Sequence, residues 1–342
     1  MSTAAPLRDI LLKLCRREDL TRGEARDAFT HLMSGQATDG QIGGLLVGLA
    51  AKGTTVEELV GAAQAMRAKV LPVESPAGGV VLDTCGTGGD VRGTFNISTA
   101  AAILAASCGV KVVKHGNKSA TSKSSSADVL EHLGIKLEIT PEIAHQCLAS
   151  AGICFAYARS HHPAMKFVAA TRTSLGIPTI FNLLGPLTNP AGAAHQLLGV
   201  FAPELTDRMA TVLRELGSKH AWVVHAEDGL DELSTLGPTR VSELKDGEVR
   251  TFTVDPEDVG LPYARLSDLQ AESPEESANI IRLMLQGKPG AAKDIAVLNA
   301  GAALLVAGKV SELRDGITEA ENALESGKAA ETLAKWVKSS HG

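Results

Sequence analysis

The first seventy residues carry apolar side chains at helical spacing, separated by residues that cap or break helices. The pattern predicts four helices, over 7–15, 21–35, 39–51 and 55–69. Thr21 and Glu24 form a capping-box pair at the start of the second helix, and Gly35 ends it. Three glycines in the third helix, at 43, 44 and 48, indicate a very close neighbour, either in the same chain or in a second subunit.

The pattern changes after the breaker-rich stretch 72–79, where short apolar runs begin to alternate with helical ones. Strands are expected at 80–82, 110–113, 135–139, 153–157, 196–201 and 221–225, and helices at 98–107, 126–133, 141–151, 274–285, 294–307 and 318–326. This alternation predicts an α/β fold with a mainly parallel central sheet.

The expected organisation is therefore a small all-helical N-terminal domain, residues 1–72, and a larger α/β domain, residues 73–342. The alternation is interrupted between 163 and 190. We expect that helical insertion to pack back on the N-terminal bundle and to join the small domain.

Charge and cysteine content narrow the class of protein. The net charge of −6 gives no support for a nucleic-acid surface. The five cysteines are odd in number and form no C-x-x-C pair, which fits a reducing compartment and argues against a structural zinc site. The first residues, MSTAAPLRDI, lack the pattern of a signal peptide, so a cytoplasmic protein is expected.

A glycine-rich segment, DTCGTGGD (83–90), follows the first predicted strand of the α/β domain. Such loops direct backbone N–H groups at phosphates, although this one is neither G-x-G-x-x-G nor a Walker loop. A plain turn with Asp90 as a helix cap is the alternative. The segment NIST (96–99) comes next, and its hydroxyls either cap a helix or face the same anion.

A second polar loop, KHGNKSATSKSSSAD (114–128), begins where a predicted strand ends. Ligands bind at that end of the strands in open α/β sheets. Its lysines and hydroxyls are suited to a phosphorylated substrate, whereas Ser126 and Asp128 also serve to begin a helix.

Two further groups are weaker signals by themselves. HHPAMK (161–166) and Arg172 lie near a strand-to-helix junction, where an arginine is suited to a carboxylate. DGLDE (228–232) ends in adjacent carboxylates that suit a divalent cation, although most acidic pairs are solvated surface.

Together these segments resemble the anthranilate phosphoribosyltransferase family almost from end to end. The resemblance is carried by DTCGTGGD (83–90), NIST (96–99), KHGN (114–117), SADVLEHLG (126–134), HHPAMK (161–166), TIFNLLGPLTNPA (179–191) and GLDELS (229–234).

The resemblance implies an enzyme of tryptophan biosynthesis with nucleoside-phosphorylase-like architecture, which dimerises through its small domain. It implies transfer of the phosphoribosyl group of 5-phosphoribosyl 1-pyrophosphate to the amine of anthranilate. The implied contacts to phosphoribosyl pyrophosphate are Gly86, Gly89, Asp90, Thr94, Asn96, Ser98, Thr99, Lys114 and Ser126. The implied contacts to anthranilate are Gly86, His115, Asn117, His162 and Arg172. Two Mg2+ ions are expected on Ser98, Asp231 and Glu232.

Three positions depart from the pattern of the family. Lys118 stands where arginine is usual, Ser125 replaces a glycine, and Pro178 replaces an arginine. Lys118 keeps the charge and loses the forked geometry of a guanidinium. These changes bear on affinity and loop motion more than on reaction type.

Two other functions remain open on the residues alone. One is a pyrimidine nucleoside phosphorylase of the same architecture, which would use free phosphate. The other is a non-catalytic relative that binds nucleic acid, for which a basic chain without the metal carboxylates is expected.

Overall fold

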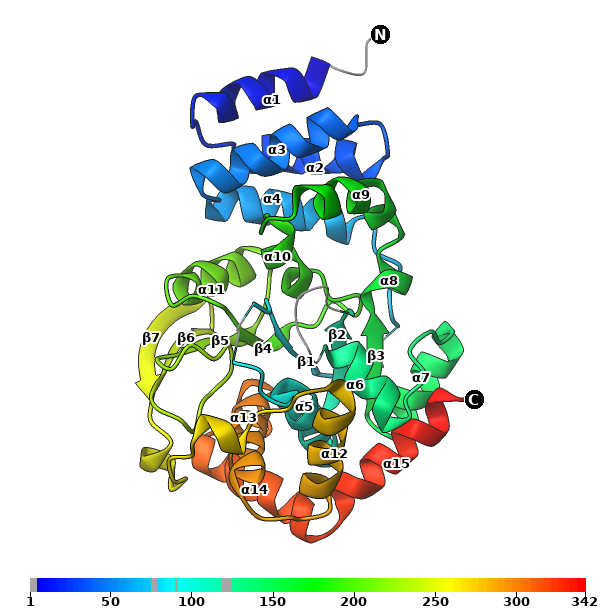
Figure 1. Cartoon of the computed structure of the whole chain (residues 1–342), viewed down its shortest axis with the longest axis vertical. Helices are drawn as coiled ribbons and strands as arrows, with labels where there is room; N and C mark the ends of the chain where they lie inside the picture. The colour runs from blue at the N-terminus through cyan, green and yellow to red at the C-terminus, as the bar shows by residue number, and fades with distance from the viewer. Residues whose placement is uncertain (1–4, 75–78, 90–91, 119–124) are drawn as a thin grey trace.

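The computed structural model describes residues 5–74, 79–89, 92–118 and 125–342. A helical bundle occupies one end of the molecule and an α/β unit the other (Figure 1). The bundle begins with α1 (Ala5–Cys15), α2 (Arg22–Met33), α3 (Asp39–Lys52) and α4 (Val56–Arg67). Capping boxes open α2, α3 and α4, because a threonine and a Glu or Gln three residues later bond reciprocally to the first turn. All four predicted helices of the bundle are therefore present.

The glycines of α3 are explained by neighbours in the same chain. A Cβ at Gly44 would lie 3.2 Å from Leu11, and one at Gly48 would lie 3.0 Å from Leu14, both on α1. Gly43 faces Thr171 of α9 (Lys166–Leu175). Of the two interpretations left open by the sequence, packing within the bundle accounts for these residues.

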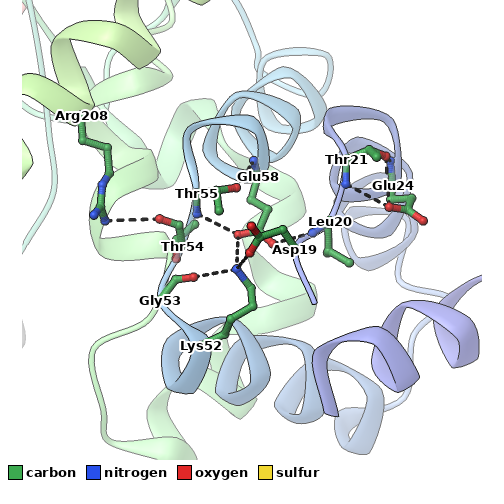
Figure 2. A network of polar contacts seen from close by, with 10 residues as sticks. All are labelled: Asp19, Leu20, Thr21, Glu24, Lys52, Gly53, Thr54, Thr55, Glu58 and Arg208. Carbon is green, nitrogen blue, oxygen red and sulfur yellow. Dashed lines mark hydrogen bonds and ion pairs between the residues drawn. The ribbon is translucent and has the colours of Figure 1, made fainter. Parts of the chain in front are cut away.

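A buried carboxylate ties the loops of the bundle together (Figure 2). Glu58 is fully buried; its Oε1 accepts from Leu20 N at 2.8 Å and its Oε2 accepts from Thr55 N at 2.8 Å. Lys52 Nζ lies 3.0 Å from Glu58 Oε2 and 2.7 Å from Asp19 Oδ1. Although burial opposes it, hydrogen bonding to these two carboxylates raises the pKa of Lys52.

The α/β unit is built on one seven-stranded sheet with the order β3-β2-β1-β4-β5-β6-β7. The strands are β1 (Val81–Gly86), β2 (Lys111–Gly116), β3 (Ile153–Tyr157), β4 (His195–Gly199), β5 (His220–Ala226), β6 (Thr239–Lys245) and β7 (Glu248–Val254). The first five are parallel, and β6 and β7 extend the sheet in antiparallel fashion. The chain order reverses at β1, so the sheet has its topological switch point there.

Helices cover both faces of the sheet (Figure 1). The remaining α-helices are α5 (Ile97–Ser107), α6 (Ser126–Leu133), α7 (Pro141–Ser150), α8 (Ala158–His161), α10 (Phe181–Leu184), α11 (Leu205–Glu215), α12 (Pro274–Leu285), α13 (Ala291–Val306), α14 (Leu313–Glu325) and α15 (Lys328–Ser340). Helices α5 and α13 pack together on one face, and α11 packs on the other. None of the helices in the described ranges is both long and apolar enough to span a membrane.

Two hydrophobic cores result. One lies between the sheet and the C-terminal helices; the other joins the opposite face of the sheet, through α11, to the helical bundle. Helix α9 packs against α2 and α3, and Val168 of α9 belongs to this second core. The insertion at 163–190 therefore contacts the bundle, while the boundary at 72/73 stays a prediction.

Some predicted elements differ from those observed. No strand forms at 135–139: after the left-handed Gly134, Ile135 and Leu137 are buried, but Lys136 N donates to Ser340 Oγ of α15 instead of to a neighbouring strand. The alternating pattern therefore reflected burial under a helix. The sequence analysis also missed β6, β7, α11 and α15, and it began α14 five residues late.

Candidate active site

The polar loops predicted from the sequence meet at one edge of the sheet, where the parallel strands end. The glycine-rich loop follows β1, KHGN closes β2, and DGLDE follows β5. Because β1 lies between β2 and β4, its loop stands at the switch point, where ligands bind in sheets of this kind. Gly86 and Gly89 are exposed there, and Asp90 lies outside the described residues.

The first turn of α5 contributes main-chain N–H groups and hydroxyls to the same edge. Asn96 caps the helix, since its Oδ1 accepts from Thr99 N at 3.1 Å. Ser98 is partly buried, and its N–H and hydroxyl lie in that first turn. The hydroxyl of Thr99 is buried with no hydrogen-bond partner among the described residues. This end of α5 carries the partial positive charge of a helix N-terminus.

The stretch before α5 is held by the segment that leads into α12. Thr94 forms an isolated bridge with Gln270, and Phe95 N donates to Leu269 O at 2.8 Å. Asn96 N donates to the buried Ser277 Oγ at 2.9 Å. Residues far along the chain therefore fix the approach to the helix cap.

Lys114 of β2 places a buried cation beneath this turn. Its Nζ donates to Thr84 O at 2.5 Å and to Ser98 Oγ at 3.0 Å, and only 1% of the residue is exposed. Burial lowers the pKa of Lys114, against the opposing charges of Asp83 and Glu232. The ammonium is thus held in place by main-chain and side-chain oxygens before any ligand binds.

Asp83 anchors the strands below the site. It is fully buried; its Oδ1 accepts from His115 N at 3.1 Å and its Oδ2 from Asn189 Nδ2 at 2.8 Å. Burial raises the pKa of Asp83, whereas the bond from Asn189 and the charge of Lys114 lower it. Sequence analysis assigned no role to Asp83 or Asn189. The sequence signal that could have identified Asp83 was a carboxylate directly after the apolar run that begins the first strand.

The last two residues of DGLDE, Asp231 and Glu232, face the glycine-rich loop and α5. A Cβ at Gly86 would lie 2.8 Å from Asp231 Oδ2, so the absence of a side chain at Gly86 makes room for that carboxylate. Glu232 Oε1 accepts from Ser98 N at 3.1 Å. The described residues contain no cluster of three or more His, Cys, Asp or Glu side chains that could hold a metal ion by themselves.

Two histidine side chains are in contact near the end of β2, the strand that carries His115. His115 Nε2 lies 3.1 Å from His162 Nε2, and His115 Nδ1 lies 3.1 Å from Gly185 O. A carbonyl only accepts, so His115 Nδ1 carries a hydrogen and, in the neutral ring, its Nε2 accepts from His162. Burial first, and then neighbouring histidines, lower the pKa of His115 to about 3 and that of His162 to about 4.

The remaining predicted residues lie on α9, just after β2 and at the start of α6. Arg172, on α9, is half-buried with its guanidinium 4.8 Å from the centre of the Phe181 ring. Burial lowers the pKa of Arg172. Asn117 is exposed just after β2, and Ser126, in the first turn of α6, lies directly against Gly116. In the part of the chain that the structure describes, Arg172 makes no hydrogen bond with either histidine.

Known proteins resemble this chain along most of its length. The profile of the glycosyl transferase family, helical bundle domain, matches residues 8–70, and that of the glycosyl transferase family, a/b domain, matches residues 78–330. The anthranilate phosphoribosyltransferase of Methylobacterium sp. (strain 4-46) is 50% identical over 327 residues, which cover 96% of each chain. The chain belongs to the anthranilate phosphoribosyltransferases.

Solved structures of this family have the same fold. The crystal structure of the enzyme from Thermus thermophilus has a TM-score of 0.91 at 42% identity, covering 98% of this chain and 100% of that one. The enzyme from Saccharomyces cerevisiae, in complex with phosphoribosyl pyrophosphate and Mg, has a TM-score of 0.89 at 28% identity, covering 99% of each chain. The helical bundle and the α/β unit therefore both have the fold of these relatives.

Two of the three positions expected to depart from the family pattern have local partners in this chain. Lys118 Nζ lies 2.7 Å from Glu131 Oε2 and 3.7 Å from Asp128 Oδ1, both on α6. Ser125 caps α6 by accepting from Asp128 N at 3.2 Å. Pro178 is exposed, and nothing in the structure explains its choice.

Proposed function

We propose that this chain transfers the phosphoribosyl group of 5-phosphoribosyl 1-pyrophosphate to the amine of anthranilate. The products are N-(5-phosphoribosyl)anthranilate and pyrophosphate, and the reaction is a step of tryptophan biosynthesis in the cytoplasm. One observation carries the proposal: the glycine-rich loop, the first turn of α5, Lys114 and the Asp231–Glu232 pair meet at the switch point of the sheet.

The diphosphate of the substrate is assigned to the glycine-rich loop and the start of α5. Gly86 and Gly89 are exposed in the loop, and α5 adds the positive end of its dipole and the hydroxyls of Ser98 and Thr99. The Thr99 hydroxyl, buried without a partner among the described residues, is suited to a phosphate oxygen. Thr94 and Asn96 complete the wall of the loop, and Ser126 borders it at the end of β2.

The donor set next to this loop fits Mg2+. Asp231, Glu232 and Ser98 offer hard oxygen ligands, and the two carboxylates approach the Gly86 loop and the α5 turn. Mg2+ characteristically binds one or two carboxylates together with substrate phosphates, and we propose two such ions. When bound, Mg2+ supplies positive charge that stabilises the departing pyrophosphate.

Anthranilate is assigned to His115, Asn117, His162 and Arg172, beside Gly86. The depressed pKa values of about 3 and 4 keep His115 and His162 neutral at pH 7, so they serve as hydrogen-bonding groups. Arg172 supplies the cation for the carboxylate of anthranilate.

The residues of the chain act by orientation and electrostatics. An aromatic amine is a nucleophile in its neutral form, so attack on the anomeric carbon needs no strong base. The C–N bond forms as the bond from the anomeric carbon to pyrophosphate breaks. Lys114 and the positive N-terminal end of the α5 dipole stabilise the charge that develops on the leaving diphosphate. No side chain forms a covalent intermediate.

A homodimer through the helical domain is part of the proposal. Leu12 of α1 and Val47 of α3 are 42% and 40% exposed, which is high for large apolar side chains on adjacent helices. Small-domain residues 1–72, with about 163–190, would form this interface. V47D should convert a dimer to a monomer in light scattering, whereas a monomeric parent would contradict this assignment.

Purified protein tests the activity directly. With Mg2+, phosphoribosyl pyrophosphate and anthranilate, we expect loss of anthranilate fluorescence and equimolar release of pyrophosphate. A variant carrying both Asp231→Asn and Glu232→Gln should lose activity by at least about a hundredfold. Turnover of a pyrimidine nucleoside with phosphate, without consumption of anthranilate, would overturn the proposal.

A further inference from the structure

A fully buried asparagine on α13 contacts the main chain that carries the two acidic residues of the site. Asn299 is the polar residue among the buried residues of this helix, which are otherwise alanine, glycine and branched aliphatic side chains. Its side chain faces Leu233, the residue that follows Glu232. A polar side chain in such surroundings is stable only with its hydrogen bonds made.

The amide of Asn299 makes three hydrogen bonds. Its Oδ1 accepts from Leu233 N at 3.0 Å, and its Nδ2 donates to Leu233 O at 2.8 Å and to Ile295 O at 2.9 Å. Both hydrogens of the amide and its oxygen are therefore used. The side chain binds the N–H and the C=O of one residue together, as a neighbouring strand would.

Leu233 needs such a partner because it is fully buried outside the sheet. β5 ends at Ala226 and β6 begins at Thr239, so Leu233 has no place in the strand ladder. Buried main-chain N–H and C=O groups are costly when unpaired. A primary amide carries a donor and an acceptor on two separate atoms, as a peptide group does. Neither an aliphatic nor a hydroxyl side chain of this size offers that arrangement.

The result is that the acidic pair is linked to two helices that pack on each other. The Glu232 side chain accepts from Ser98 N at the start of α5, and the main chain one residue later is held by α13. α13 and α5 are in contact within the core between the sheet and the C-terminal helices. Neither of these two links involves a ligand, so the acidic pair is held in this arrangement before a ligand binds.

We propose that Asn299 is a positioning residue that sets the place of Asp231 and Glu232 for the divalent cation. This inference rests on the proposed function, because it assigns the cation to those two carboxylates. Asn299 acts only through the Leu233 main chain and touches neither substrate nor metal. Loss of its amide frees the end of the acidic loop while the glycine-rich loop and the Arg172 region keep their supports.

The test uses Asn299→Leu, which keeps the number and branching of the side-chain heavy atoms and removes all three bonds. Leu304→Ala is the matched control: Leu304 is equally buried on the same helix, more than one turn further along. Mn2+ is the probe, with its binding in the presence of phosphoribosyl pyrophosphate followed by electron paramagnetic resonance. Thermal midpoints and the KM for anthranilate are measured on the same samples.

We expect N299L to bind Mn2+ at least tenfold more weakly than the parent, with KM for anthranilate within twofold. L304A should have a lower thermal midpoint and Mn2+ affinity within twofold of the parent. N299L with parental Mn2+ affinity would overturn the positioning role. If N299L does not fold, N299S is measured in the same way against the same limits. A parent that neither binds Mn2+ with the substrate nor consumes anthranilate would instead refute the proposed function.

Discussion

At the scale of single residues, burial rather than residue type determines the charges and hydrogen bonds of the polar groups in the site. Lys114, Asp83 and His115 are ordinary polar residues in the sequence, yet none is more than 7% exposed and each is held by hydrogen bonds. Residues at this depth are poorly hydrated, so their charges and tautomers are set by neighbours. Their contribution to binding should therefore be sensitive to conservative substitutions.

The histidine pair should make stability depend on pH. The fold lowers the pKa of His115 to about 3 and of His162 to about 4, so below pH 6.5 the unfolded chain binds protons that the folded chain does not. Stability is therefore fully present above pH 6.5 and is lost as the pH falls. Between pH 7 and pH 5 the loss should be roughly 2 kcal/mol for each histidine. Urea unfolding of the parent and of His162→Gln at both pH values measures it; equal pH dependence in the two proteins would contradict this origin.

Arg172 should govern the use of anthranilate. Arg172→Lys keeps a charge and loses the two parallel hydrogen bonds that a guanidinium gives a carboxylate. We expect KM for anthranilate to rise roughly tenfold to a hundredfold, which corresponds to about 1.5–3 kcal/mol, with KM for phosphoribosyl pyrophosphate little changed. Lys166→Gln, at an exposed position of the same helix, is the control. Parental anthranilate kinetics in the arginine variant would remove Arg172 from the site.

At the scale of elements, the site depends on loops that approach the strand ends closely. The main chain of Asp231 lies directly over Gly199, the last residue of β4: a Cβ there would fall 1.6 Å from Asp231 O. The loop therefore lies where it does because both β1 and β4 end in glycine. The two strands create the space, and the acidic loop occupies it.

Gly199→Ala should displace that loop. Because the methyl group would overlap main-chain atoms rather than a flexible side chain, Asp231 and Glu232 must move together. We expect transferase activity to fall by more than about a hundredfold, as when a charge-stabilising group is lost. Gly237→Ala is a suitable control, since its added Cβ would have no atom within 4 Å. Activity of G199A within threefold of the parent would show that the loop tolerates the shift.

The sequence predicted elements where local signals were strong. Capping residues and helical spacing identified α1 to α4, and glycine- or lysine-rich loops marked the ends of β1 and β2. Prediction from the sequence failed where tertiary contacts determine the structure. Residues 135–139 alternate like a strand but lie under α15. Strands β6 and β7 pair only with each other and with β5. Asp83 and Asn299 were missed for the same reason. The partner of Asp83, Asn189, is 106 positions away in the chain, and Leu233 is 66 positions from Asn299.

At the scale of the whole molecule, one hydrophobic core crosses from the helical bundle to the sheet. It includes residues of α2, α4 and α11 as well as β4 and β5. Polar contacts reinforce this connection: Arg67 Nη1 donates to Leu216 O at 3.2 Å, and Arg208 Nη1 donates to Thr54 O at 3.3 Å, the latter drawn in Figure 2. The bundle should therefore unfold together with the α/β unit.

Glu58 should be the most sensitive polar residue of the bundle. Removing it leaves Lys52 buried, with only Asp19 as a charged partner, and frees the N–H groups of Leu20 and Thr55. Glu58→Ala should lower the free energy of unfolding by about 3–5 kcal/mol, as for other broken buried ion pairs. Glu57→Ala, on the exposed side of α4, should change it by less than about 1 kcal/mol. Chemical denaturation measures both, and a similar loss in the two variants would contradict the role of burial.

The decisive measurement is the position of the diphosphate in a crystal of this protein with phosphoribosyl pyrophosphate and Mg2+. We predict phosphate oxygens at the first turn of α5 and on the Gly86 loop, with the cation between them and the carboxylates of Asp231 and Glu232. A diphosphate bound away from the ends of β1 and β2, or a cation that touches neither carboxylate, would contradict this prediction.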